Sequence, residues 1–177
     1  MNEADLNNTF KYDKVVVNLN NHDCLTTDAT KTSFYVNLVG PIKNVVYIKI
    51  LRASIVSPSN NPMKSAPLSY EKYEPIYITL NDYHRSVSYI KNNGTYDYVN
   101  YFDMIPYADT HYSDISYGQT SFDWTDPSVY VLNPPEQILK RLNVEFRDKT
   151  FKLFDASVLT HFNLSICVYY IKNRVWI

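Results

Sequence analysis

The sequence contains very little glycine and cysteine. Only 3 of its 177 residues are Gly and 2 are Cys. It has no glycine-rich phosphate loop, no nucleophile elbow and no histidine pair at metal-binding spacing, so the patterns that common nucleotide-binding enzymes, hydrolases and metalloenzymes need are missing. These absences predict a protein that is not an enzyme and that holds no metal or cofactor. We interpret the four histidines as surface or hydrogen-bonding residues: His22, His84, His111 and His161.

An excess of charge of one sign is also lacking. Lys and Arg number 17 against 18 Asp and Glu, which gives a net charge of −1. Proteins that bind nucleic acid through its phosphates carry a basic excess, so we expect no nucleic-acid partner. The longest apolar run, ICVYYI, is too short to span a bilayer, and the N-terminus does not resemble a secretory signal. We expect a soluble protein made in the cytosol, and contact with a membrane surface stays open.

The two cysteines, Cys24 and Cys167, lie far apart in the sequence and match no metal-binding spacing. Two cysteines are too few for a disulfide framework. We interpret them as free thiols in a reducing compartment, with a single bridge between them as the alternative.

Aromatic residues are abundant, with 17 Tyr and 8 Phe. Aromatic and β-branched residues favour strands, and several runs alternate apolar with polar residues in the way that a strand with one buried face does. One such run, Leu142 to Arg147, places Asn143, Glu145 and Arg147 opposite the apolar set. The predicted core residues are Val46, Ile48, Ile50, Ile76, Ile78, Leu80, Leu142, Val144, Phe146, Phe162, Leu164, Ile166 and Val168.

Turn-forming residues separate these runs at GP (residue 40), SPSNNP (from 57) and NNG (from 92). The best helical candidate is one or two turns at PPEQILKRL, where the prolines precede a first turn that contains Glu136. Many short strands with uneven, long connections predict an all-β fold: a single jelly-roll β-sandwich of about eight antiparallel strands in two sheets. We expect one domain over residues 13–177 and an N-terminal arm over residues 1–12.

A long loop runs from about Asp103 to Pro127 and is rich in aromatic residues. Tyrosine offers wide contact area with a polar tip and is common at interfaces. We therefore expect this segment to contact a neighbouring subunit or to fold back on its own sandwich. A further hypothesis is that its aromatic side chains stack on sugar rings. The candidate interface residues are Tyr101, Tyr107, Tyr112, Tyr117, Phe122 and Trp124.

Three segments, taken in their order along the chain, are informative together: SFYVNLVGPIKNVVYIKILRASIVSPSNNP, then YEPIYITLNDYHR, then LNPPEQILKRLNVEFRDKTFKLFDASVLTHFNLSICV. Together they cover about half the chain. Their succession resembles the single jelly-roll capsid proteins of large nucleocytoplasmic DNA viruses and their relatives, which include penton and minor capsid proteins. One departure is the turn RDKTF, where the family often has Gly.

The resemblance implies a capsid assembly protein without an active site. It favours a penton that forms a homopentamer at icosahedral five-fold vertices and contacts the major and minor capsid proteins. The protein would then reside in the virion and be assembled in the host cytoplasm. The alternatives are a minor capsid protein that cements major capsomers and, in a different class, a carbohydrate-binding jelly-roll module.

Overall fold

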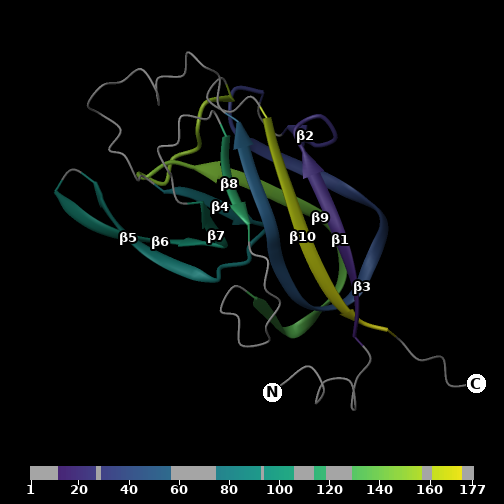
Figure 1. The fold of residues 1–177 in the computed structure, drawn as a ribbon. Coiled ribbons are helices and arrows are strands. Elements are labelled where there is room, and N and C mark those ends of the chain that lie inside the picture. The colour runs from purple at the N-terminus through teal and green to yellow at the C-terminus, as the bar shows by residue number, and fades with distance from the viewer. Residues whose placement is uncertain are drawn as a thin grey trace, which may run out of the picture.

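The computed structural model describes residues 12–26, 29–56, 75–92, 94–105, 114–118, 129–156 and 161–172. Within these ranges the chain forms ten β-strands and no α-helix (Figure 1). Residues 1–11 of the predicted arm lie outside the described residues. Its last residue, Tyr12, begins the first strand. The strands are β1 (Tyr12–Asn20), β2 (Leu25–Thr26), β3 (Ser33–Val56), β4 (Ile76–Leu80), β5 (Ser86–Asn92), β6 (Thr95–Tyr101), β7 (Asp103–Ile105), β8 (Asp114–Gly118), β9 (Tyr130–Arg147) and β10 (His161–Ile171).

Eight of the ten strands pair antiparallel in one hydrogen-bonded sheet. Its order is β1-β10-β3-β9-β4-β7, with β2 and β8 also paired to β3, while β5 and β6 form a separate two-stranded sheet. The predicted fold class, an all-β jelly-roll sandwich of antiparallel strands, is confirmed.

Two long strands, β3 with 24 residues and β9 with 18, connect the layers of the sandwich. The second half of β3 pairs with β10 and β8, whereas its first half pairs with β2 and with the end of β9, which in turn pairs with β4. The sequence predicted two strands separated at Gly40. Instead β3 continues through Gly40 and Pro41 and curves there, where its register with β9 jumps from Asn37 to Ile42 (Figure 1).

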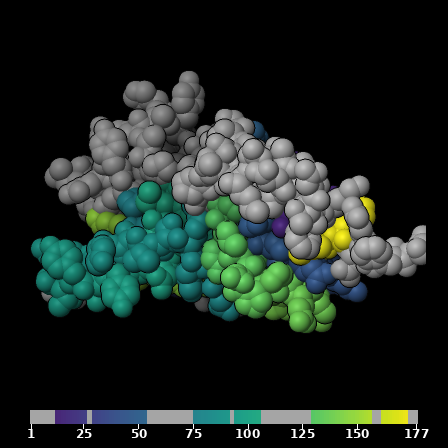
Figure 2. Space-filling model, turned by 90° about the horizontal axis from the view of Figure 1, so that it is seen from below, coloured from purple at the N-terminus to yellow at the C-terminus, as the bar shows by residue number. Residues whose placement is uncertain are grey.

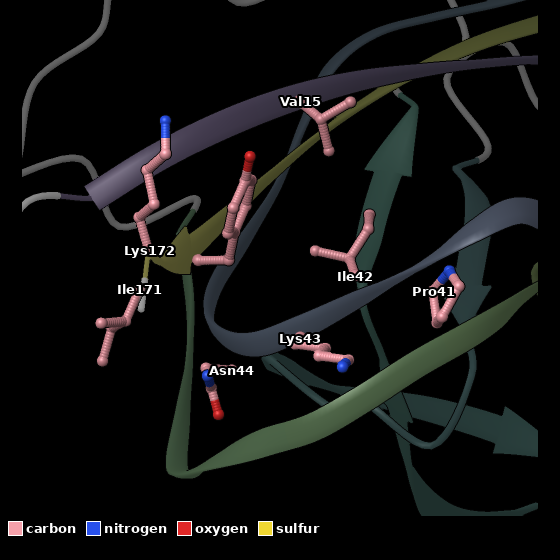
Figure 3. A pocket seen from close by; sticks show the side chains of 8 residues that line it. Val15, Pro41, Ile42, Lys43, Asn44, Ile171 and Lys172 are labelled. Atoms are coloured by element: carbon pink, nitrogen blue, oxygen red, sulfur yellow. The ribbon is translucent and has the colours of Figure 1, made fainter. Parts of the chain in front are cut away.

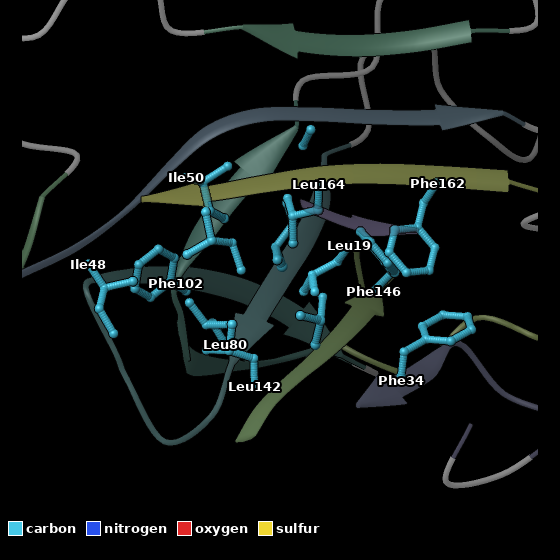
Figure 4. Close-up of a cluster of buried hydrophobic side chains, with 14 of the residues drawn as sticks. Leu19, Phe34, Ile48, Ile50, Leu80, Phe102, Leu142, Phe146, Phe162 and Leu164 are labelled. Atoms are coloured by element: carbon cyan, nitrogen blue, oxygen red, sulfur yellow. The ribbon is translucent and has the colours of Figure 1, made fainter. Parts of the chain in front are cut away.

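The core fills the space between the layers (Figure 4). Alternate residues of β3, β4, β9 and β10 point into it, as the period of two in a strand requires. Phe34, Phe146 and Phe162 pack against one another, with ring centroids 4.7 to 6.3 Å apart. All the predicted core residues are buried, and all but Val46 belong to this cluster.

The expectation that Val46 shares a face with Ile48 and Ile50 is wrong. The pairing of β3 with β10 skips Val46, since Val45 and Tyr47 pair with the consecutive residues Tyr170 and Tyr169. An extra residue in a strand reverses the alternation on one side of it. Val45 therefore enters the core, and Val46 packs on the outer face with Cys167 and other residues of a second, smaller cluster.

The helical turns expected at PPEQILKRL are also absent, because β9 runs through this segment. Leu139 is buried and the neighbouring Ile138 is exposed, as in a strand. Pro134 and Pro135 lie where β9 has no regular ladder with β3, between the pairs Val131–Tyr47 and Glu136–Val45. A missing proline N–H costs least at such a place, so tertiary pairing outweighed the local helix pattern.

The two cysteines are free and buried, Cys24 in the main core and Cys167 in the outer cluster. Burial raises the pKa of both thiols above the ordinary value. Because the thiolate is the reactive form, we expect both to react slowly with Ellman's reagent at neutral pH in the folded protein and rapidly in denaturant. Fast reaction of either thiol in the native protein would contradict this placement.

Candidate functional site

The predicted interface residues lie in or beside the segment that follows β6. Tyr101 ends β6 and is half-buried, with its ring 4.9 Å from that of Tyr77. Tyr117 belongs to β8, whose backbone pairs with β3 next to Ala53. The other candidates, Tyr107, Tyr112, Phe122 and Trp124, lie outside the described residues. Their part in an interface stays a prediction.

A different group of tyrosines gathers on the β5–β6 hairpin, which leaves the sandwich at the edge formed by β4 and β7 (Figure 1). The two strands are joined at Gly94, whose φ of 86° is easily adopted by glycine. Their register pairs Tyr89 directly with Tyr98.

One face of the hairpin is fixed to the sandwich. Ile90 is buried, and the Tyr77 hydroxyl lies 3.1 Å from the Ser88 hydroxyl. A two-stranded hairpin is marginally stable alone, so these contacts give it a defined position.

The other face carries large side chains in solvent. Tyr89, Tyr96 and Tyr98 are 77%, 72% and 71% exposed, and Val87 is 55% exposed. The rings of Tyr89 and Tyr98 meet edge to face at 6.4 Å, and the Lys91 ammonium lies 5.7 Å from the centre of the Tyr96 ring. In the space-filling view the hairpin forms one end of the molecule (Figure 2). We call Val87, Tyr89, Lys91, Tyr96, Tyr98 and Asn100 the hairpin face.

A buried ion pair holds the base of the hairpin. The Arg85 Nη2 donates to Asp103 Oδ1 at 2.9 Å, and its Nε donates to the carbonyl of Phe102 at 2.9 Å. The side chains of Arg85 and Asp103 are 14% and 6% exposed. Asp103, at the start of the long loop that the sequence predicted, therefore serves the structure of the hairpin base.

A polar pocket of about 310 Å³ opens on the outer face of the β4–β9 ladder. The outward-facing residues of both strands meet there, and the start and end of the hairpin segment and the turn after β9 complete the wall. We call it the polar pocket; its lining is Thr79, Asn81, Asp82, His84, Asn100, Asn143, Glu145, Arg147 and Phe151.

A second pocket, of about 370 Å³, lies at the bend of β3 (Figure 3). Val15, Ile42 and Ile171 give it an apolar wall, and Lys43 and Lys172 supply positive charge. Lys172 lies 3.6 Å from Asp13, an exposed pair of small energetic weight. The lining contains no carboxylate, histidine or cysteine.

The fold brings together two histidines that the sequence separates. His22 follows β1 and His161 begins β10, and their ring centroids are 5.4 Å apart. Among the described residues no group of three or more His, Cys, Asp or Glu side chains is placed to hold a metal ion. Within the same ranges no helix is long and apolar enough to cross a membrane.

Comparison with protein-family models finds no match, and comparison with curated protein sequences finds none.

Sequence reasoning missed both the hairpin face and the polar pocket. The signal for the first was present, because TYDYVNY places Tyr96 and Tyr98 at alternate positions after NNG, and SVSYIKN places Tyr89 before it. The sequence also showed, by alternation, that Asn143, Glu145 and Arg147 lie opposite the apolar face of their strand. What the sequence did not contain was the pairing of β4 with the end of β9, which places them side by side.

Proposed function

We propose that this protein is a viral capsid structural protein, and specifically a penton that closes a homopentameric ring at the five-fold vertices. The observation that carries the proposal is the hairpin face: large, exposed aromatic side chains on a hairpin whose other face is anchored to a jelly-roll sandwich. The resemblance of the three ordered sequence segments to single jelly-roll capsid proteins supports the same class.

The chemistry of the hairpin face fits contact with a second copy of the chain. Clustered exposed apolar groups mark interaction sites, and Tyr is enriched at interfaces whereas acidic residues are depleted. The face contains three tyrosines and a valine but no carboxylate. A hairpin that packs on a different surface of its neighbour makes a heterologous contact, and such contacts close rings.

In this proposal the protein works by rigid packing and not by chemistry. The sandwich holds the hairpin base through Arg85 and Asp103, and the hairpin presents its tyrosines at a fixed angle. Further contacts with major and minor capsid proteins would place the ring in the virion after assembly in the host cytoplasm. A minor capsid protein wedged between capsomers is the alternative within the class.

We expect the double variant Tyr89→Ser, Tyr98→Ser to be monomeric under conditions in which the wild type is pentameric. Both side chains are more than 70% exposed, so the substitutions remove interface area without opening the core. Native mass spectrometry reads the oligomeric state, and circular dichroism should show an unchanged strand content.

A matched control is Val39→Ser, which removes a fully exposed apolar side chain far along the chain from the hairpin. It should leave the pentamer intact. A wild-type protein that stays monomeric at all concentrations, or a pentamer that survives the tyrosine variant, would contradict the proposal. Locating the chain in purified particles separates the two capsid roles, because a single copy between capsomers would exclude the penton.

A further inference from the structure

The polar pocket contains a pre-organised hydrogen-bonding centre at Glu145. Thr79 Oγ1 donates to Glu145 Oε2 at 3.0 Å, and Arg147 donates to the same oxygen from Nε at 3.0 Å and from Nη2 at 2.6 Å. Within the described part of the chain, all hydrogen bonds of this carboxylate reach Oε2. The side chain is 29% exposed, so the carboxylate is held in position and still faces the pocket.

Amide side chains continue the polar wall. The side chain of Asn81 is fixed, since its Oδ1 accepts from the Asn143 backbone N–H at 2.7 Å and its Nδ2 donates to the Arg141 carbonyl at 3.3 Å. Asn100 and Asn143 are exposed and line the same pocket. An amide side chain both donates and accepts, which matches a hydroxyl group, because a hydroxyl does the same.

The charge of the pocket excludes an anionic ligand. Its lining has two carboxylates, Asp82 and Glu145, and a single guanidinium, Arg147. That guanidinium is committed to Glu145 and, through Nη1, to the carbonyl of Phe151 at 2.9 Å. Beside the imidazole of His84, a phosphate or carboxylate ligand would meet two acidic groups and no uncompensated guanidinium or ammonium group, so the pocket suits a neutral ligand rich in hydroxyls.

One wall of the pocket is the ring of Phe151. It lies edge to face with Tyr77 at 5.7 Å, and the Arg147 guanidinium carbon is 5.0 Å from its centre. An aromatic ring in a pocket offers an apolar surface on which the C–H groups of a sugar ring can pack, while polar groups around it fix orientation.

The backbone of Phe151 gives a second, independent reason to regard the ring as functional. Its φ is 63°, a left-handed conformation in which a bulky residue is a genuine outlier. This is the turn RDKTF, where the sequence lacks the expected Gly; Asp148 Oδ1 holds it by accepting from the backbone N–H groups of Thr150 and Lys152 at 2.8 and 2.9 Å. Strained residues of this kind cluster at binding sites.

We propose that the polar pocket binds a neutral saccharide. The C–H face of a sugar ring packs on Phe151, and its hydroxyls exchange hydrogen bonds with the amides of Asn100 and Asn143 and with Glu145. The volume of about 310 Å³ is at the small end of ligand pockets, which fits one end of a glycan and not a long chain. The inference uses none of the exposed tyrosines, and Asn100 is the one residue that it shares with the hairpin face.

The test is saturation-transfer difference NMR with the full-length protein and the methyl glycosides of glucose, galactose, mannose and N-acetylglucosamine. N-acetylneuraminic acid serves as an anionic comparison. We expect at least one neutral glycoside to bind and the acid to bind more weakly. Absence of binding by all four neutral glycosides, or stronger binding of the acid, would overturn the proposal.

Two variants locate the binding. Phe151→Gly removes the ring and relaxes the left-handed turn, and it should weaken the bound glycoside roughly tenfold or more in Kd. Asn143→Ala changes an exposed side chain, so it should weaken binding without altering the melting temperature. The Tyr89→Ser, Tyr98→Ser protein should bind as the wild type does. Unchanged affinity in both pocket variants would place the saccharide elsewhere and overturn the assignment.

Discussion

The Val144→Asp variant will be severely destabilised. Val144 is 1% exposed in the core, on the strand that pairs with both β3 and β4. A carboxylate there must be buried without a partner or protonated, and the lost packing adds to this cost. We expect a loss of about 4 kcal/mol or more, against a total stability of about 5–15 kcal/mol for a domain. Circular dichroism and denaturant unfolding measure it.

The matched control is Ile138→Asp, on the same strand. Ile138 is 45% exposed, so its carboxylate stays in water and the change should cost little. If the Val144→Asp protein is soluble and melts at the wild-type temperature, the register of β9 is displaced by one residue. A shift of one residue exchanges the buried and the exposed faces of a strand.

Arg85→Ala will be strongly destabilising. It leaves Asp103, 6% exposed, without the guanidinium that balances its charge, and it leaves the Phe102 carbonyl without its side-chain donor. Removing one partner of a buried ion pair typically costs about 3–5 kcal/mol. Urea unfolding should show this loss, and the hairpin base should lose protection in hydrogen exchange before the core does.

The double variant Arg85→Met, Asp103→Leu separates a charge effect from a packing effect. Replacing a buried ion pair by apolar side chains of similar size is often nearly neutral. We therefore expect the double variant to be clearly more stable than Arg85→Ala. If it is equally unstable, the role of Arg85 is in its hydrogen bond to Phe102 and in packing on that ring, from which its guanidinium carbon is 5.8 Å away.

Much of the fold could be predicted from alternation alone. Val144, Phe146, Phe162 and Leu164 are buried because side chains in a strand point to opposite faces, and that period is a local property of the chain. Val46 could not be placed in this way. Its side follows from an extra residue in β3 relative to β10, and only the pairing of the two strands defines that extra residue.

The segment PPEQILKRL shows a second limit. Its prolines and Glu136 are typical of a helix start, yet the segment forms part of β9. Propensity is a weak preference when a neighbouring strand offers backbone hydrogen bonds and a core offers burial for Leu139.

The sequence by itself determined that the chain forms an all-β sandwich and which faces of its strands are apolar, because both depend on residues a few positions apart. The tertiary structure decided where surfaces form. It placed Thr79 beside Glu145 across the β4–β9 ladder, and it exposed Tyr89 and Tyr98 while Ile90 anchored the hairpin. The first of these arrangements joins residues from distant parts of the chain, so it depends on strand pairing that no local pattern encodes.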